Sequence, residues 1–217
     1  MKSIRRQQSG FTLVEIAIVL VIIGLLLGGI LKGQELINSA KVKSFAQDYR
    51  TIQTAIYGFQ DRYKALPGDF AGTRLTNNIS GSTSAPATGT ENNGQINGDW
   101  DSATATEESC LVWQHLRLAG FLAGPTTVGC AAGNDYLQKN ADGGRIGISS
   151  TMQITGMTGS FNICSSGILG KFAKQLDTQL DDGTTNTGSV RVALISAPTA
   201  ALATVNDADA TIVCLAF

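Results

Sequence analysis

The sequence predicts an α+β fold, in which one long N-terminal helix is followed by a small antiparallel sheet and two short helices. Three observations predict it. Residues 11–31 form an apolar run that is broken by one carboxylate, Glu15. A one-sided apolar pattern then extends the helix to about residue 64. Beyond it, short clusters of apolar and β-branched residues alternate with turn residues, as is typical of strands in a small sheet.

The first half of the long helix is long enough to cross a membrane. Residues 11–31 number 21, and at about 1.5 Å per residue they span roughly 30 Å, the thickness of a bilayer core. A short leader, residues 1–10, precedes them and carries Lys2, Arg5 and Arg6. These positive charges predict that the leader lies on the cytoplasmic side and that the bulk of the chain faces outward.

The second half of the long helix, residues 32–64, has one apolar face. Its large apolar residues recur at alternating steps of four and three, the spacing of one helix side. They are Phe45, Tyr49, Ile52, Ile56, Phe59 and Tyr63. Pro67 follows and ends the helix. We expect this face to pack against a globular head that comprises residues 65–217.

The head is predicted to contain one long loop, two short helices and several short strands. Residues 71–106 are rich in Thr, Asn, Ser and Gly and have no periodic pattern, which is typical of a loop. Helices are predicted at about residues 107–121 and 168–180. Strands are predicted near residues 152–154, 160–164, 189–195 and 211–217.

The charge pattern gives no support to a nucleic-acid partner. The chain has 16 basic and 17 acidic residues, and three of the basic ones lie in the leader. Without the leader, 13 basic residues remain against 17 acidic ones, a net charge near −4. No basic run or aromatic-basic stripe follows the leader, so we expect no nucleic-acid binding.

The sequence offers no arrangement of residues that favours catalysis. The only histidine, His115, lies in the predicted helix 107–121 beside Trp113 and Leu116, where a packed side chain is commoner than a general base. Neither a G-x-S-x-G nucleophile motif nor a glycine-rich phosphate loop is present. We therefore predict that the protein is not an enzyme.

The junction between the leader and the apolar run resembles the prepilin signature. Gly10 is followed by Phe11-Thr12-Leu13-Val14-Glu15 and then by the apolar helix. Unlike a secretory signal peptide, the leader has no apolar region before the cleavage position. The chain is therefore similar to type IV pilins and to the pseudopilins of type II secretion. Many pilins carry a proline just after the apolar stretch, whereas Lys32 stands here.

The resemblance implies how the N-terminus is processed. A prepilin peptidase would cut between Gly10 and Phe11, and the same enzyme would methylate the new amine of Phe11. Glu15 is the expected assembly residue, because a carboxylate within a membrane segment costs a few kcal/mol unless it is paired. The implied architecture is the pilin fold, in which the first half of the spine helix is transmembrane and the second half packs on the head.

The resemblance also implies a function, a structural subunit of a type IV pilus or pilus-like filament. Its partners would be copies of itself and other pilins, the prepilin peptidase and the inner-membrane assembly machinery. Its precursor would cross the bacterial inner membrane once, with a periplasmic head, before it enters a surface pilus or a periplasmic pseudopilus. Two alternatives stay open. One is a pseudopilin of a type II secretion system, and the other is a membrane-anchored module that binds calcium or another ligand.

Four cysteines lie in the predicted head: Cys110, Cys130, Cys164 and Cys214. An even number in an oxidising compartment predicts two disulfides, and the close pairs of a zinc site are absent. Among the three connectivities we predict Cys110–Cys130, which closes a short loop around a helix, and Cys164–Cys214, which ties a strand to the C-terminal strand. The second pair also resembles pilins that pin the C-terminal region of the head by a disulfide.

Calcium is the one candidate cofactor. Asn97, Asp99 and Asp101 alternate, and Glu108 stands where a twelve-residue calcium loop places its bidentate acid. The pattern departs from such loops at three positions. Asn97 stands at the first position, Ser102 replaces the turn glycine, and Ala103 could offer only its backbone. The alternative interpretation is a polar loop that leads into a helix, because acidic residues favour helix N-termini.

A second candidate metal site comprises Asp177, Asp181 and Asp182. Asp177 and Asp181 are like charges one helical turn apart, and all three lie near a predicted helix C-terminus, where negative charge is unfavourable. A bound cation would offset this repulsion.

Overall fold

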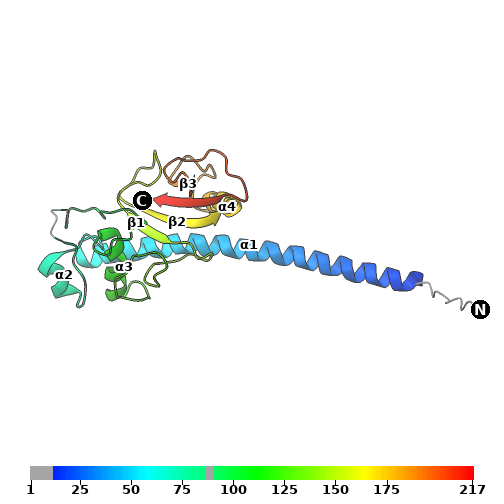
Figure 1. The fold of residues 1–217 in the computed structure, drawn as a ribbon, viewed down its shortest axis with the longest axis horizontal. Coiled ribbons are helices and arrows are strands. Elements are labelled where there is room, and N and C mark those ends of the chain that lie inside the picture. The colour runs from blue at the N-terminus through cyan, green and yellow to red at the C-terminus, as the bar shows by residue number, and fades with distance from the viewer. Residues whose placement is uncertain (1–11, 87–89) are drawn as a thin grey trace, which may run out of the picture. The chain divides into compact units, whose positions relative to one another are not determined.

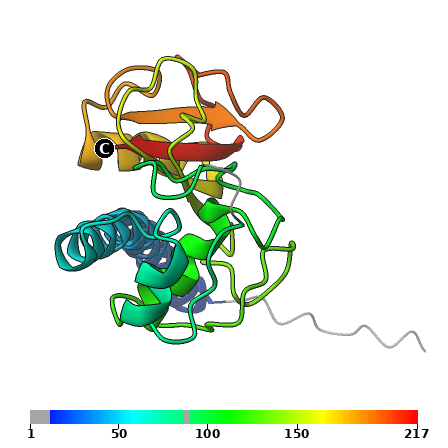
Figure 2. The same ribbon diagram turned by 90° about the vertical axis from the view of Figure 1, so that its left-hand side faces the viewer.

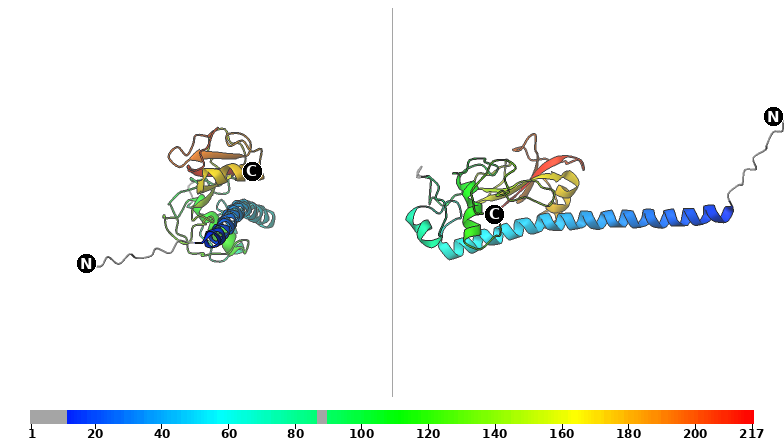
Figure 3. Two further views of the ribbon diagram at one scale, coloured as in Figure 1. Left: turned by 90° about the vertical axis from the view of Figure 1, so that its right-hand side faces the viewer. Right: turned by 60° about the horizontal axis from the view of Figure 1, so that its bottom comes forward.

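The computed structural model describes residues 12–86 and 90–217 (Figure 1). The chain divides into two compact units, Met1–Ala40 and Lys41–Phe217. The predicted leader and the Gly10–Phe11 cleavage position lie outside the described residues. One helix, α1 (Leu13–Tyr63), contributes residues to both units, and it can be followed in Figure 3. It matches the predicted long helix, and its 51 residues contain no proline to interrupt the hydrogen-bond ladder.

The described part of the first unit is helix alone. From residue 12 to residue 40 no side chain is buried, although most of these residues are apolar. The apolar run ends at Lys32, which forms an ion pair with Glu35 at 2.6 Å on the helix surface. This unit therefore has no core of its own within the described residues.

In the second unit, one face of α1 is buried from Val42 onward. The buried side chains are Val42, Phe45, Ala46, Tyr49, Ile52, Ala55, Ile56 and Phe59. They include all of the predicted stripe except Tyr63, which is partly buried against the same core. The helix ends at Tyr63, and the next residue, Lys64, has a left-handed backbone with φ of 52°, three residues before Pro67.

Three short helices complete the helical part of the described chain. They are α2 (Gly72–Asn78), α3 (Glu108–Leu118) and α4 (Gly170–Leu180). The last two correspond to the two predicted helices, and α2 is an addition within the region that was predicted to be loop. Its seven residues bury a single apolar side chain, Leu75, so no helical periodicity could reveal it.

The sheet has four antiparallel strands in the order β1-β2-β4-β3. They are β1 (Ile146–Ser149), β2 (Asn162–Leu169), β3 (Val190–Leu194) and β4 (Ala210–Ala216). In Figure 2 the orange and red arrows of β3 and β4 lie in the upper part of the view and the green α3 lies below them. The small antiparallel sheet confirms the predicted α+β fold class.

Two of the predicted strands differ from the structure. Residues 152–154 form an irregular, bent segment instead of a strand, and β1 lies just before them. Gly147 interrupts the β1 pattern because the backbone of Trp100 occupies the place where a Cβ would lie. β2 runs on past residue 164 to a register shift before Ile168, so Ile168 and Leu169 belong to β2 and not to the start of α4.

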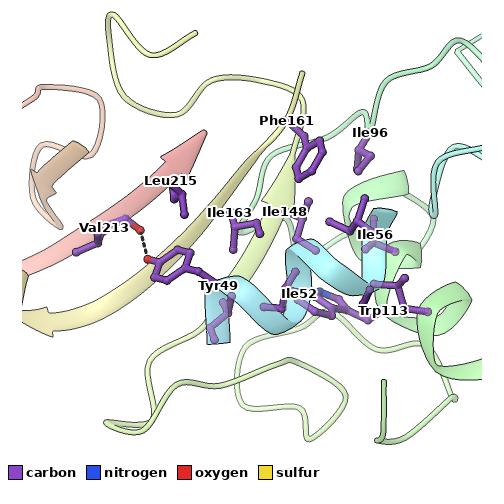
Figure 4. Packing of buried hydrophobic residues seen from close by; sticks show 14 of the residues in the cluster. Tyr49, Ile52, Ile56, Ile96, Trp113, Ile148, Phe161, Ile163, Val213 and Leu215 are labelled. Carbon is purple, nitrogen blue, oxygen red and sulfur yellow. Dashed lines mark hydrogen bonds between the residues drawn. The ribbon is translucent and has the colours of Figure 1, made fainter. Parts of the chain in front are cut away.

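The main core lies where the sheet meets the buried face of α1 and α3. Figure 4 shows Ile148, Ile163 and Leu215 from three strands beside Tyr49 and its neighbours on α1. The Tyr49 hydroxyl donates a hydrogen bond to the carbonyl oxygen of Val213 at 2.7 Å. A smaller cluster is also buried: Trp100, Ile154, Met157, Cys164, Ala193, Ile212, Cys214 and Ala216.

Two disulfides cross-link the second unit, and they are the two predicted pairs. Cys110–Cys130 joins α3 to the loop that follows it, across 20 residues. Cys164–Cys214 joins opposite positions of the paired strands β2 and β4, across 50 residues. Both disulfides therefore stabilise Lys41–Phe217 and leave the first unit without a cross-link in its described part.

Candidate functional site

The apolar half of α1 is an uncovered hydrophobic surface. Within the described chain, α1 is the one helix that is long and apolar enough to cross a membrane. None of its 18 most apolar consecutive residues is buried. Leu20 and Leu26, for example, are 64% and 60% exposed. Apolar area of this extent requires a cover, which lipid or the helices of other chains can provide.

The one acidic residue of this apolar half, Glu15, is bonded back to the helix start. The backbone N–H and the hydroxyl of Thr12 both donate to Oε2 of Glu15 at 2.8 Å. The backbone N–H of Glu15 in turn donates to Oγ1 of Thr12 at 3.3 Å. This reciprocal arrangement is a capping box, which satisfies N–H groups of the first helical turn.

The capping box was missed in the sequence, although the Thr12-x-x-Glu15 spacing is its signal. It directs the carboxylate toward the N-terminal end of α1. Among the described residues, Oε1 of Glu15 accepts no hydrogen bond, so this oxygen remains available to another group. Gly10 and Phe11, the predicted cleavage and methylation residues, lie outside the described residues.

The first candidate calcium loop is closed by hydrogen bonds. Oε2 of Glu108 accepts the backbone N–H of Asn97 at 2.8 Å and its side-chain N–H at 3.0 Å. Glu108 is buried, and this burial raises the pKa of its carboxyl, against the effect of the Asn97 bonds. Asp99 and Asp101 are exposed, and in residues 12–86 and 90–217 they form no group with Glu108 close enough to share one ion. The structure thus joins Asn97 to Glu108 alone.

His115 is a packed residue in the core of the second unit. Its Nδ1 accepts the backbone N–H of Gly68 at 2.9 Å, and its Nε2 donates to the carbonyl oxygen of Thr83 at 2.9 Å. Burial lowers the pKa of the imidazole to about 4. Both ring nitrogens of the neutral side chain are therefore used to connect α3 to two loops.

The second candidate metal site is brought together by the fold. Asp177, Asp181 and Asp182 each offer a carboxylate oxygen, and these oxygens lie within 4.8 Å of one another. Asp177 is fully buried, and neither of its carboxylate oxygens has a hydrogen-bond partner in the described residues. Burial, followed by the charges of Asp182 and Asp181, raises the pKa of Asp177 to about 6.

One comparison with known proteins gives a match, at the N-terminus. Residues 5–31 match the family described as the prokaryotic N-terminal methylation motif. No curated protein and no solved structure matches the chain. The matched range contains Gly10, Phe11, Glu15 and the apolar run, the same features that resemble prepilins in the sequence. The chain therefore carries the N-terminal signature of type IV pilins and pseudopilins.

Proposed function

We propose that this chain is a structural subunit of a type IV pilus or a pilus-like filament. The observation that carries the proposal is the uncovered apolar half of α1. It begins at the Thr12–Glu15 capping box, inside the methylation motif. A helix that only anchors a protein in a membrane needs no acidic residue there. A helix that must leave the membrane and pack in register with its copies does gain from one.

The apolar surface suits both the membrane and the filament. Lipid tails and neighbouring apolar helices are similarly non-polar, so transfer from one to the other involves little change in hydrophobic free energy. The choice of partner and register then depends on the polar groups. Glu15 is the one acidic group in the apolar run, which supports its role as the residue that selects the assembled state.

Cleavage after Gly10 would supply the partner of this carboxylate. The new amine of Phe11 is positively charged, and in a staggered bundle the amine of one subunit can approach Glu15 of its neighbour. Oε2 of Glu15 is bonded to Thr12, whereas Oε1 accepts no hydrogen bond from the described residues and is the better placed oxygen for this contact. An ion pair in a lipid-like environment is far more favourable than a lone carboxylate.

The compartment of the head follows from the same proposal. The basic leader keeps the N-terminus in the cytoplasm, so the second unit would face the periplasm. Two disulfides support this placement, because they persist in oxidising compartments such as the periplasm. The subunit would thus wait in the inner membrane, with its peptidase and assembly machinery, until it enters a filament.

The pseudopilin of a type II secretion system is the second candidate, since it shares the methylation motif and the uncovered helix. Electron microscopy of sheared surface material, labelled with an antibody to the head, separates the two. Long labelled fibres support a pilin. Labelled material that is confined to the cell envelope supports a pseudopilin.

The central test replaces Glu15 with alanine in a strain that lacks the native gene. We expect normal cleavage and normal membrane levels but at least about tenfold less subunit in the sheared filament fraction, since the unpaired amine remains in a non-polar bundle. Glu35→Ala is the matched control, because Glu35 is exposed and, among the described residues, its one ion pair is with Lys32. Filament yields of Glu15→Ala equal to the control would contradict the proposed role.

Mass spectrometry of the purified membrane form tests the processing step. The proposal requires an N-terminus at Phe11 that carries one methyl group, and it requires Gly10→Val to accumulate as the uncut chain. An N-terminus elsewhere, or an intact leader in the wild type, would favour the membrane-anchored ligand-binding module over both filament subunits.

A further inference from the structure

The acidic cluster at the end of α4 combines three features that favour a bound cation. Asp177 lies on the last turn of α4, and Asp181 and Asp182 follow directly after it. Their carboxylate oxygens lie within 4.8 Å of one another. The C-terminal end of a helix carries partial negative charge, so the position adds to the repulsion among the three acids.

Asp177 is the residue that an acidic surface patch alone would not explain. Its side chain is fully buried, yet both of its oxygens lack a hydrogen-bond partner in the described residues. A buried carboxylate without partners is strongly unfavourable. Asp181 and Asp182 differ from it, because they are less buried and accept hydrogen bonds from their own loop.

The negative charge of the cluster is not balanced by a basic side chain. Within residues 12–86 and 90–217, no lysine or arginine forms an ion pair with any of the three acids. On α4 itself, Lys174 pairs with Asp207 at 2.6 Å, and Lys171 lies over the ring of Phe172. On β3, Arg191 donates to the carbonyl oxygen of Thr155 at 2.8 Å. The positive charges on the neighbouring elements are thus directed elsewhere.

We propose that Asp177, Asp181 and Asp182 bind a calcium ion. Calcium takes six to eight oxygen ligands at about 2.3–2.6 Å, so two oxygens on opposite sides of one ion lie about 4.6–5.2 Å apart. A set of carboxylate oxygens within 4.8 Å fits inside this shell. Water fills the remaining positions, as it commonly does at calcium sites.

The burial gradient across the cluster suits an ion that enters from solvent. Asp177 is buried, Asp181 is half-buried and Asp182 is exposed. The ion would replace the missing partners of the Asp177 oxygens, which a hydrogen bond from Asp181 or Asp182 cannot do because an ionised carboxylate is only an acceptor. The exposed side leaves room for the coordinating water.

A bound ion would connect α4 to β3. Oδ2 of Asp181 accepts the backbone N–H of Val190, the first residue of β3, at 2.8 Å. The carboxylate of Asp182 accepts the N–H of Thr184 and the hydroxyl of Thr187, both at 2.8 Å. An ion that holds both acids against Asp177 would therefore fix the loop between the helix and the strand.

The test measures thermal unfolding of the full chain in detergent, with EDTA and then with calcium chloride raised to about 10 mM, a range that covers weak calcium sites. We expect the Tm of the wild type to rise by about 5–10 °C once calcium exceeds its Kd about a hundredfold. Asp177→Asn keeps the shape of the side chain but removes its charge. Its Tm should be independent of calcium and should equal or exceed that of the wild type in EDTA.

Asp207→Asn is the matched control, because it makes the same change at an exposed acid that contacts α4 through Lys174. It should keep the calcium-dependent rise. A wild-type Tm that is unchanged by calcium would overturn the proposal, and so would an equal rise in Asp177→Asn, which would place the ion elsewhere. Filament assembly can be scored separately in the same variants, so failure here leaves the proposed function intact.

Discussion

The two units of the chain differ in whether their apolar side chains are buried or exposed. In Lys41–Phe217 the apolar side chains cover one another, and two disulfides hold the result. In residues 12–40 the apolar side chains are exposed around the whole helix, and no described residue is buried. One helix, α1, belongs to both. The comparison shows that one half of α1 is part of the folded head, whereas the other half is an apolar surface that no described residue covers.

The largest expected effect comes from the disulfide that joins β2 and β4. Replacing Cys164 and Cys214 together by alanine should lower the free energy of unfolding by about 4 kcal/mol, because the bond closes a 50-residue loop. Replacing Cys110 and Cys130 in the same way should cost about 3 kcal/mol, because that loop has 20 residues.

Chemical denaturation of the full chain in detergent measures both losses. Trp100 and Trp113 are both buried in the second unit, so their fluorescence reports the unfolding of the head alone. A larger loss of stability in the Cys110/Cys130 variant than in the Cys164/Cys214 variant would contradict this ranking by loop length. Membrane insertion of both variants should be unchanged, since neither bond involves residues 12–40.

A matched pair of leucine truncations compares the units directly. Leu116 on α3 is fully buried, whereas Leu26 on α1 is 60% exposed. Leu116→Ala should destabilise the head by about 3 kcal/mol, since it leaves a cavity, and Leu26→Ala should leave head unfolding unchanged. In the sheared filament fraction we expect the opposite order. Leu26→Ala should reduce the amount of subunit more than Leu116→Ala, because the Leu26 position would face a neighbouring subunit. Equal effects on head stability would show that the two units are energetically one.

The smallest predicted effect is the dependence of head stability on pH through His115. Burial lowers the pKa of this imidazole to about 4, below the usual value of 6.5, so the unfolded chain binds the proton more readily. The contribution is complete above pH 6.5 and is lost as the pH falls toward 4. Between pH 7 and pH 5 it should amount to about 2 kcal/mol.

Denaturation curves at several pH values, for the wild type and for His115→Gln, isolate this contribution. Other acids with raised pKa values, such as Asp48 at about 6, titrate in both proteins and cancel in the difference. The variant should be less stable at pH 7 but should lose less stability on acidification. Parallel pH profiles would show that His115 is not the responsible group.

Much of the fold could be predicted because its signals are local and repeated. The spacing from Phe45 to Tyr63 fixes one face of α1, and the β-branched runs of β3 and β4 mark those strands. β1 was not predicted, because the contact that explains its sequence involves a distant part of the chain. Gly147 is needed there because the backbone of Trp100 passes too close for a side chain. A contact of this kind leaves no periodic trace in a single sequence.

The candidate sites show the same division. The Thr12–Glu15 pair is readable from spacing alone, since a capping box joins residues three apart. The segment from Asn97 to Glu108 has residue types that suit a calcium loop, but Asp99 and Asp101 are exposed to solvent in the structure. Conversely, nothing in the sequence shows that Asp177 is buried without partners, because that property depends on how α4 packs.

The order of the strands has a consequence for how the protein is made. β4 is the last of the four strands in the chain, yet it lies inside the sheet, between β2 and β3. During synthesis β2 and β3 therefore wait with open edges until residues 210–216 leave the ribosome, and open strand edges invite aggregation. A nascent chain that stalls before this point exposes those edges to proteases and chaperones. Such an incomplete chain would therefore be open to removal before its sheet has formed.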